Sequence, residues 1–344
     1  MAVQVSPSHD ASPAGYAGFP RALAALLRCP SDGSELAPRG PSGAAHITDG
    51  GLACAVCGHV VPIVSGIVRL LAAETFEQEE RHEIALRDSQ ARTLAREREF
   101  AYWASPYSRR ETAATLRALD ADKAHTALDL GCGTGRYTRL LAERCRAVLA
   151  VDFSLGSLGW LARENTPAPN VGLVHGDITR LRLAPRGFHR VLATTPLDTR
   201  EQRLAMHHVA ADALADGGVY VFSTEHYDLR TRLLGAPRAQ RYKPGDNLFF
   251  RLTRAEVERE AAPYFARVRS RPINVSLPFS RLLPPPLCVG LSRAAERVPV
   301  LRQLGDLLLV RAMRPIRAPE EGVFSGGSRL FRSVHRLWRK APDA

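Results

Sequence analysis

The chain has 344 residues, of which 45% are hydrophobic, so it can bury a core and form two or three structural units. Lysine and arginine number 47 against 35 acidic residues, and the net charge of +12 indicates either an anionic partner or an arginine-rich genome. No run of 18 apolar residues occurs, which excludes a membrane-spanning helix. Six cysteines, two of them in a Cys-x-x-Cys, fit a reducing compartment better than a disulfide framework, so we expect a cytoplasmic protein.

The chain begins with a stretch, residues 1–18, that is rich in serine, proline, alanine and glycine. Such a composition buries little apolar surface, and we expect a disordered leader. The stretch has no basic region followed by an apolar one, so it is not a secretory signal. A short apolar helix pattern follows over residues 19–27.

Residues 19–72 hold two cysteine-containing turns beside short β-rich runs, which is the layout of a zinc ribbon. A complete site would have a second cysteine in the first turn, where this chain has Asp32. Carboxylate oxygen also binds Zn²⁺, and His59 is the other candidate for the fourth ligand. A closed site of this kind is structural, and a degenerate ribbon without metal is the alternative. The predicted metal ligands are Cys29, Asp32, Cys54 and Cys57.

A charged helical pattern occupies residues 73–126 and predicts a helical segment between the ribbon and the next domain. Residues 127–136, Ala-Leu-Asp-Leu-Gly-Cys-Gly-Thr-Gly-Arg, then combine an apolar strand, a glycine turn and the start of a helix. Glycine lets the backbone approach a ligand because it lacks a Cβ and adopts positive φ at little cost. A dinucleotide-binding loop would have glycine where Arg136 stands, so the spacing argues against a nicotinamide cofactor.

Acidic residues end three successive predicted strands, at Asp129, Asp152 and Asp177. Ligands of doubly wound sheets bind at the carboxyl ends of the strands, so these acids mark one site. With the glycine spacing, this pattern resembles the class I S-adenosylmethionine-dependent methyltransferases. The resemblance implies that Asp152 accepts the ribose hydroxyls and that Asp177 meets the adenine amino group. The implied cofactor-binding residues are Asp129, Gly131, Gly133, Gly135, Asp152, Phe153, Asp177 and Ile178.

The same resemblance extends to both flanks of this domain. The N-terminal unit is similar to the zinc ribbon found as a separate activator of tRNA and protein methyltransferases and fused to some rRNA and small-molecule methyltransferases. In the family, helices before the first strand fold over the cofactor as a lid. Tyr102, Trp103 and Tyr107 are therefore either lid residues or ordinary packing residues.

Strands and helices alternate over residues 127–315, which predicts a parallel sheet with right-handed crossovers. We expect an α/β fold with a doubly wound, mostly parallel seven-stranded sheet, in which the last two strands, 265–270 and 306–312, resemble those of the family and one runs antiparallel. The other predicted strands are 127–130, 147–152, 171–175, 188–194 and 218–224, and the predicted helices are 136–144, 154–164 and 199–215.

Long stretches after the fifth strand, residues 225–250 and 272–304, are expected to build an acceptor pocket. His226 directly follows that strand and is the first candidate for a base or an acceptor-orienting group, although a structural role is the alternative. His207 and His208 lie on the preceding helix and are expected at the surface or between domains.

The residues at the strand ends argue against two classes of methyl acceptor. The fourth strand lacks the Asn-Pro-Pro-Tyr type signature of DNA amine methyltransferases, and no cysteine ends the fourth or fifth strand, which argues against 5-methylcytosine chemistry. The leading hypothesis is transfer of a methyl group from S-adenosylmethionine to oxygen or carbon of a small organic acceptor. The alternatives are rRNA or tRNA as the acceptor, and a non-catalytic, cofactor-binding partner subunit.

The C-terminal tail, residues 316–344, contains a basic amphipathic helix pattern over residues 328–340. Such a helix can lie on an anionic membrane surface, contact RNA phosphates, pack on another subunit or dock on its own domain.

Overall fold

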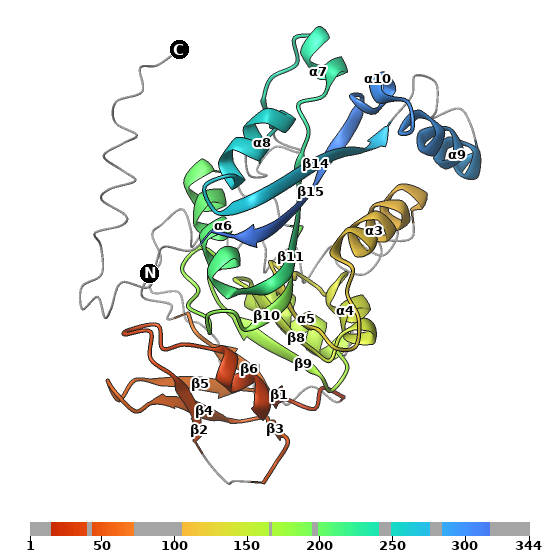
Figure 1. The fold of residues 1–344 in the computed structure, drawn as a ribbon. Helices are drawn as coiled ribbons and strands as arrows, with labels where there is room; N and C mark the ends of the chain where they lie inside the picture. Colours follow the sequence, from red (N-terminus) through yellow and green to blue (C-terminus); the bar gives the residue numbers. More distant parts are fainter. Residues whose placement is uncertain are drawn as a thin grey trace, which may run out of the picture.

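One long mixed sheet runs through most of the molecule (Figure 1). The computed structural model describes residues 15–39, 43–71, 105–164, 167–194, 199–240, 249–275 and 284–316. The sheet has eleven strands in the order β14-β15-β11-β10-β7-β8-β9-β6-β5-β4-β2. Within the described ranges, no helix is both long enough and apolar enough to cross a membrane.

Seven strands of this sheet form the predicted doubly wound unit. Five are parallel neighbours, and β15 lies antiparallel between β11 and β14. The expected α/β fold with a mostly parallel seven-stranded sheet is confirmed, including one antiparallel strand near the end of the chain. The strands are β7 (Thr126–Leu130), β8 (Ala147–Asp152), β9 (Val171–His175), β10 (Phe188–Ala193), β11 (Leu214–Glu225), β14 (Phe265–Val275) and β15 (Gly305–Pro315).

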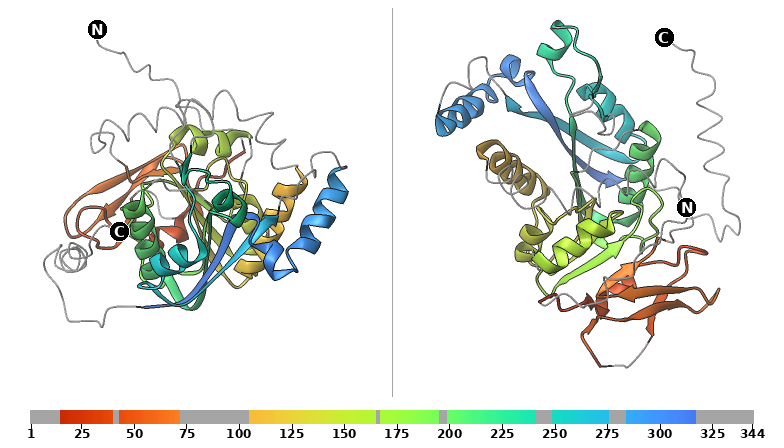
Figure 2. Two further views of the ribbon diagram at one scale, coloured as in Figure 1. Left: turned by 90° about the horizontal axis from the view of Figure 1, so that it is seen from above. Right: turned by 180° about the vertical axis from the view of Figure 1, so that it is seen from behind.

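Helices cover both faces of the sheet, and each face has its own buried apolar cluster. On one face lie α3 (Pro106–Leu119), α4 (Thr138–Arg144) and α5 (Leu155–Glu164); on the other lie α6 (Arg200–Ala213) and α8 (Arg254–Ala261) (Figures 1 and 2). The central strands are apolar on both sides because both of their faces are covered.

Local signals explain where several helices begin and end. Capping boxes start α6, with Thr199 and Gln202, and α8, with Thr253 and Glu256, so exposed N–H groups at each helix start are satisfied. The α3 helix ends at Asp120, which adopts the left-handed conformation with φ of 55°.

The N-terminal unit continues the sheet, which the sequence does not predict. Strand β6 (Ile67–Arg69) pairs in parallel with the edge strand β9, so that Ile67 lies opposite Leu173. The edge of β9 is thereby covered, which removes a row of unpaired backbone groups. The other elements of the unit are β1 (Phe19–Pro20), the 3₁₀ helix η1 (Arg21–Leu26), β2 (Leu36–Arg39), β3 (His46–Ile47), β4 (Gly50–Cys54) and β5 (Val60–Val64).

Residues 15–18, the described part of the expected leader, are bound to the body of the protein through Tyr16. Tyr16 is buried, its hydroxyl donates to the carbonyl oxygen of Val171 at 3.2 Å, and it accepts from the N–H of Leu173 at 3.2 Å. The folded N-terminal unit thus includes residues before Phe19, because a side chain of the expected leader bonds to β9. Residues 1–14 lie outside the described residues.

The stretches after β11 and β14 contain short elements at the end of the sheet where β11 finishes (Figure 1). They are α7 (Leu229–Leu233), β12 (Ala239–Gln240), β13 (Phe249–Phe250), α9 (Pro285–Ala295) and α10 (Pro299–Arg302). Two predictions fall outside the described residues: the lid aromatics Tyr102 and Trp103, and the basic amphipathic helix of the tail. Tyr107 lies in α3 and is half-buried.

Candidate cofactor, acceptor and metal sites

The glycine loop after β7 is bound to the end of the neighbouring strand β8. The N–H groups of Gly131 and Cys132 both donate to the carbonyl oxygen of Val151, at 2.8 and 3.0 Å. Gly131, Gly133 and Gly135 have φ of 72°, 53° and 93°, a region that favours glycine. A Cβ placed on Gly133 would meet no atom within 4 Å, so this loop borders open space in which a ligand can approach the backbone.

Asp152 ends β8 and is buried beside this loop. Its Oδ2 accepts a hydrogen bond from the N–H of Gly133 at 2.7 Å, and its Oδ1 accepts one from the N–H of Ser154 at 2.9 Å. Two backbone donors therefore fix the orientation of the carboxylate.

Asp129 lies on the adjacent strand β7 and is also buried. Its Oδ2 accepts a hydrogen bond from the Thr138 hydroxyl at 2.7 Å. Burial raises the pKa of Asp129 to about 7, the Thr138 hydroxyl opposes this rise, and the negative charge of Asp152 adds to it. Two acids that repel each other in a buried site favour a positively charged ligand.

Asp177 follows β9 and stabilises its own turn. Its Oδ1 accepts hydrogen bonds from the N–H and the hydroxyl of Thr179, at 2.8 and 2.7 Å, and Arg180 lies 3.4 Å from its Oδ2. Ile178 is buried, and the carbonyl oxygen of Phe153 lies 3.1 Å from Nε2 of His175. The structure thus places the predicted acids at the ends of three adjacent parallel strands.

The sequence did not predict how α3 is attached to the glycine loop. Arg136 forms an ion pair with buried Glu111 at 3.2 Å and donates to the carbonyl oxygen of Ser108 and to Thr112, both at 2.9 Å. The next residue, Tyr137, donates to Glu111 at 3.4 Å. Arg136, the residue that argued against a dinucleotide, therefore anchors α3 to the glycine loop. The only sequence signal for this contact is the opposite charge of Glu111, which lies 25 positions earlier in the chain.

His226 directly follows β11 and is buried. Its Nδ1 lies 2.6 Å from the carbonyl oxygen of Gly305. Because a carbonyl only accepts, Nδ1 carries the proton and Nε2 of the neutral ring is left as an acceptor. Burial lowers the pKa of His226, and the hydrogen bond to Gly305 opposes this effect.

The two histidines on α6 differ in their surroundings. His208 is exposed and lies 3.3 Å from Asp212. The expected surface or interdomain position is wrong for His207, which is buried with its Nδ1 3.2 Å from the Tyr220 hydroxyl. Burial lowers its pKa to about 3, so the ring is neutral and structural.

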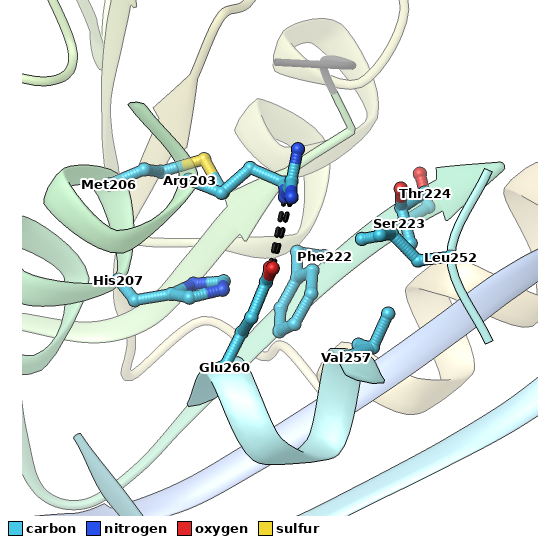
Figure 3. A pocket seen from close by; sticks show the side chains of 9 residues that line it. All are labelled: Arg203, Met206, His207, Phe222, Ser223, Thr224, Leu252, Val257 and Glu260. Carbon is cyan, nitrogen blue, oxygen red and sulfur yellow. Dashed lines mark hydrogen bonds and ion pairs between the residues drawn. The ribbon is translucent and has the colours of Figure 1, made fainter. Parts of the chain in front are cut away.

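A small pocket lies between α6, β11 and α8, and Figure 3 shows the side chains that line it. Its walls contain a buried ion pair in which Arg203 contacts both oxygens of Glu260, at 2.9 and 3.0 Å. The pocket encloses about 10 Å³, which is near the minimum for one water molecule. It is therefore too small for an organic acceptor.

The four predicted metal ligands converge in the N-terminal unit. The ligand atoms of Cys29, Asp32, Cys54 and Cys57 all lie within 4.8 Å of one another. The sulfurs of Cys29 and Cys57 are 3.5 Å apart, close to the edge of about 3.8 Å that a tetrahedron with Zn–S bonds of about 2.3 Å requires. The Cys54 sulfur lies 3.4 and 3.6 Å from the Asp32 carboxylate oxygens. His59 is not a member of this cluster.

Comparison with known proteins agrees with this geometry. Residues 127–218, which include the glycine loop and all three strand-end acids, match the family described as "Methyltransferase domain". The 2-phytyl-1,4-naphtoquinone methyltransferase of Thermosynechococcus vestitus is 34% identical over 76 residues, which are 21% of this chain and 34% of that protein. The match thus spans about a third of that relative's length.

Two solved structures resemble the fold weakly. The N-methyltransferase NodS of Bradyrhizobium japonicum, in complex with S-adenosyl-L-homocysteine, is 17% identical, covers 66% of this chain and 97% of its own, and has a TM-score of 0.45. An S-adenosylmethionine-dependent methyltransferase of Mesorhizobium loti is 18% identical. The match covers 61% of this chain and 99% of that protein, with a TM-score of 0.43.

The family match, the strand order and the strand-end acids define the class of protein. Residues 127–218 match a methyltransferase domain, and the sheet that contains it continues into a small ribbon-like N-terminal unit.

Proposed function

We propose that the chain binds S-adenosylmethionine at the carboxyl ends of β7, β8 and β9 and transfers its methyl group to oxygen or carbon of a small organic acceptor. The observation that carries the proposal is the buried Asp152 carboxylate, which backbone N–H groups orient beside the glycine loop. When bound, the cofactor supplies a methyl group on a positively charged sulfur. Asp129 and Asp152 favour that charge, and the open space at Gly133 lets the loop backbone contact the ligand.

We propose that the acceptor binds next to the end of β11. Strand β10 alone separates β7 from β11, and Phe222 of β11 is level with Leu130 at the end of β7. His226 is therefore about 10 Å across the sheet from the glycine loop and about 13 Å further along the strand direction. His226 offers Nε2 as a base for the acceptor proton, because Nδ1 is engaged by Gly305. The relative whose name contains a phytyl-substituted naphthoquinone supports an apolar ring compound as the acceptor.

Calorimetric titration with S-adenosylmethionine and S-adenosylhomocysteine tests the cofactor site. Wild type is expected to bind both ligands, and Asp152→Ala to lose binding, because the ribose hydroxyls lose their acceptor. Asp212→Ala, an acid exposed on α6, is the matched control and is expected to bind as wild type does. Equal affinity of wild type and Asp152→Ala would remove the assignment of this strand end.

The acceptor class is tested by salt. Turnover of a small acceptor is expected to change little between low and moderate ionic strength, whereas RNA affinity falls steeply because counterions are released on binding. Cofactor binding without turnover of any acceptor would favour a non-catalytic partner subunit.

The cysteine cluster supports a second, structural role. We propose that Cys29, Asp32, Cys54 and Cys57 hold one zinc ion, because three sulfurs and a carboxylate converge at tetrahedral spacing. The site has four protein ligands and no open position, so the metal stabilises the N-terminal unit and takes no part in methyl transfer.

A further inference from the structure

An apolar and basic surface lies at the end of the molecule opposite the N-terminal unit (Figure 1). On α7, the residues Leu233 and Leu234 are 78% and 77% exposed. Arg230 and Arg232, which precede them in the chain, are exposed as well. Large apolar side chains this exposed are unfavourable in water unless a partner covers them.

The segment containing α9 and α10 has the same character. Val300 is 68% exposed, Leu287 and Leu291 are also exposed, and Arg293 and Arg297 are exposed among them. The two segments are neighbours, because the N–H of Leu229 at the start of α7 donates to the carbonyl oxygen of Gln303 after α10, at 3.0 Å. Figure 2 shows α7 and α10 at the same end of the molecule when it is seen from behind. We call the exposed side chains of residues 229–234 and 287–301 the leucine–arginine face.

Helix α9 buries small or polar side chains and exposes its leucines. Its buried residues are Cys288, Ser292, Ala295 and, directly after the helix, Glu296, whereas Leu287 and Leu291 are exposed. Glu296 contacts buried Arg110 of α3 and accepts from the N–H of Asn274 at 2.8 Å. These contacts fix one side of the helix to the body of the protein and leave the leucines on the outward side.

The charge of this face identifies its partner. The leucine–arginine face contains four arginines, Arg230, Arg232, Arg293 and Arg297, and its single acid is buried Glu296. RNA phosphates would attract the arginines but would leave the leucines and valines in water. An anionic lipid bilayer satisfies both, because arginine binds the headgroups while leucine enters the interface.

We propose that the leucine–arginine face docks the protein on an anionic membrane surface. The elements that form it directly follow β11 and β14, so docking would bring the acceptor end of the sheet to the lipid. Docking itself is independent of methyl transfer, whereas delivery of a lipid-soluble acceptor from the bilayer rests on the proposed function.

Flotation of the full chain with vesicles tests the docking. Wild type is expected to float with vesicles that contain phosphatidylglycerol and to bind pure phosphatidylcholine more weakly. Leu233→Asp/Leu234→Asp and Arg230→Glu/Arg232→Glu are each expected to weaken binding to anionic vesicles by about tenfold or more. Ile316→Asp is the matched control, because Ile316 is 50% exposed but lies beside Tyr264, at the start of β14 and away from α7. Cofactor titration of each variant reports separately on folding and on the proposed function.

Several results would overturn the proposal. In the first, wild type stays in solution with anionic vesicles, or forms a dimer that hides the face and does not float. In the second, both double variants float as wild type does, which would place the contact elsewhere, for example in the C-terminal tail. Loss of binding in the arginine variant alone, or binding to an RNA fragment with no binding to vesicles, would indicate phosphate recognition in place of membrane docking.

Discussion

The ring of Phe19 lies directly against the backbone of Gly172, at the joint between the N-terminal unit and the methyltransferase domain. A Cβ on Gly172 would come within 2.7 Å of Cε2 of Phe19 and within 2.9 Å of Cδ1 of Leu23. Phe19 is fully buried, so this contact and the β6–β9 pairing join the two units into one body. The ribbon-like unit is therefore part of the core, and its packing contributes to the stability of the domain that carries the cofactor site.

The first prediction concerns this joint. Phe19→Ala is expected to lower the free energy of unfolding by about 3–5 kcal/mol, because it leaves a cavity under η1. Gly172→Ala is expected to lower it by about 1–3 kcal/mol, because the new methyl group overlaps the ring. Urea unfolding followed by circular dichroism measures both changes.

The double variant provides a sharper test of the same contact. In the Phe19→Ala background, Gly172→Ala is expected to cost clearly less, because the ring it would meet is gone and Leu23 has a flexible end. Gly290→Ala is the matched control, since a Cβ there meets no atom within 4 Å in helix α9. Strictly additive changes would mean that Phe19 and Gly172 are not in contact.

The second prediction concerns pH and Asp129. Its folded pKa of about 7 lies above its unfolded value of 3.8, so the folded state binds more protons between these values. The free energy of unfolding is therefore expected to fall as pH rises from about 4 to about 7, by on the order of 4 kcal/mol from this group. Asp306, whose pKa burial also raises to about 7, adds a slope of the same sign.

Asp129→Asn separates the two contributions. The amide retains the hydrogen bond with Thr138 but has no charge to bury, so the variant is expected to lose the part of the slope that Asp129 contributes. Buried His207, whose folded pKa is lowered to about 3, contributes a slope of the opposite sign in wild type and variant alike, so the difference between the two proteins reports on Asp129. Asp212→Asn, on the exposed side of α6, should leave the slope unchanged. Unfolding midpoints in urea from pH 4 to pH 8 measure it, and an unaltered slope in Asp129→Asn would contradict the shifted pKa.

The arrangement of the candidate cofactor site could largely be predicted because its signals are local. Asp129, Asp152 and Asp177 each end a short apolar run, and the glycine loop follows the first of these runs directly. An apolar run of five residues bounded by an acid or glycine indicates both the strand and its end. The predicted boundaries of β8 and β9 agree with the structure residue for residue.

The features that the sequence did not predict depend on contacts between distant segments. Strand β6 joins β9 across about a hundred residues, and neither run shows which edge it will meet. His207 is polar, yet it is buried because Tyr220 on β11 supplies a hydrogen-bond partner. Arg136 is likewise explained only by Glu111 on α3.

The third prediction concerns the metal. Purified protein is expected to contain one zinc per chain by elemental analysis, and Cys57→Ser to contain little or none. Cys288→Ser, which removes a buried thiol on α9, is the control for loss of a cysteine. Asp32→Cys is expected to hold zinc more tightly against a chelator, because thiolate is the softer ligand.

Metal removal is also expected to destabilise the fold. Because a structural zinc contributes its binding energy to folding, chelation should lower the unfolding midpoint of wild type. The midpoint of Cys57→Ser should then be insensitive to the chelator. Wild type purified without zinc, and unable to take it up, would mean that the ribbon is degenerate and that its thiols pack as ordinary core residues.

The fourth prediction concerns His226. Burial keeps its pKa below the ordinary 6.5, so Nε2 is expected to remain unprotonated and able to accept a proton down to a lower pH than an exposed histidine. Turnover of an acceptor that must lose a proton should therefore fall on the acid side, as the pH drops through this lowered pKa. His226→Asn places an amide N–H near the position of Nδ1, where it can still donate to Gly305, but it has no base.

This variant is expected to bind S-adenosylmethionine as wild type does, to lower kcat by about 10²–10⁴ and to lose the acid limb of the pH profile. A purely structural histidine would change stability and KM but would leave the shape of the pH profile intact. His208→Asn, on the exposed side of α6, is the matched control. An unchanged profile and kcat in His226→Asn would move the base elsewhere, or indicate an acceptor, such as an enol or a phenol, that needs little help to lose its proton.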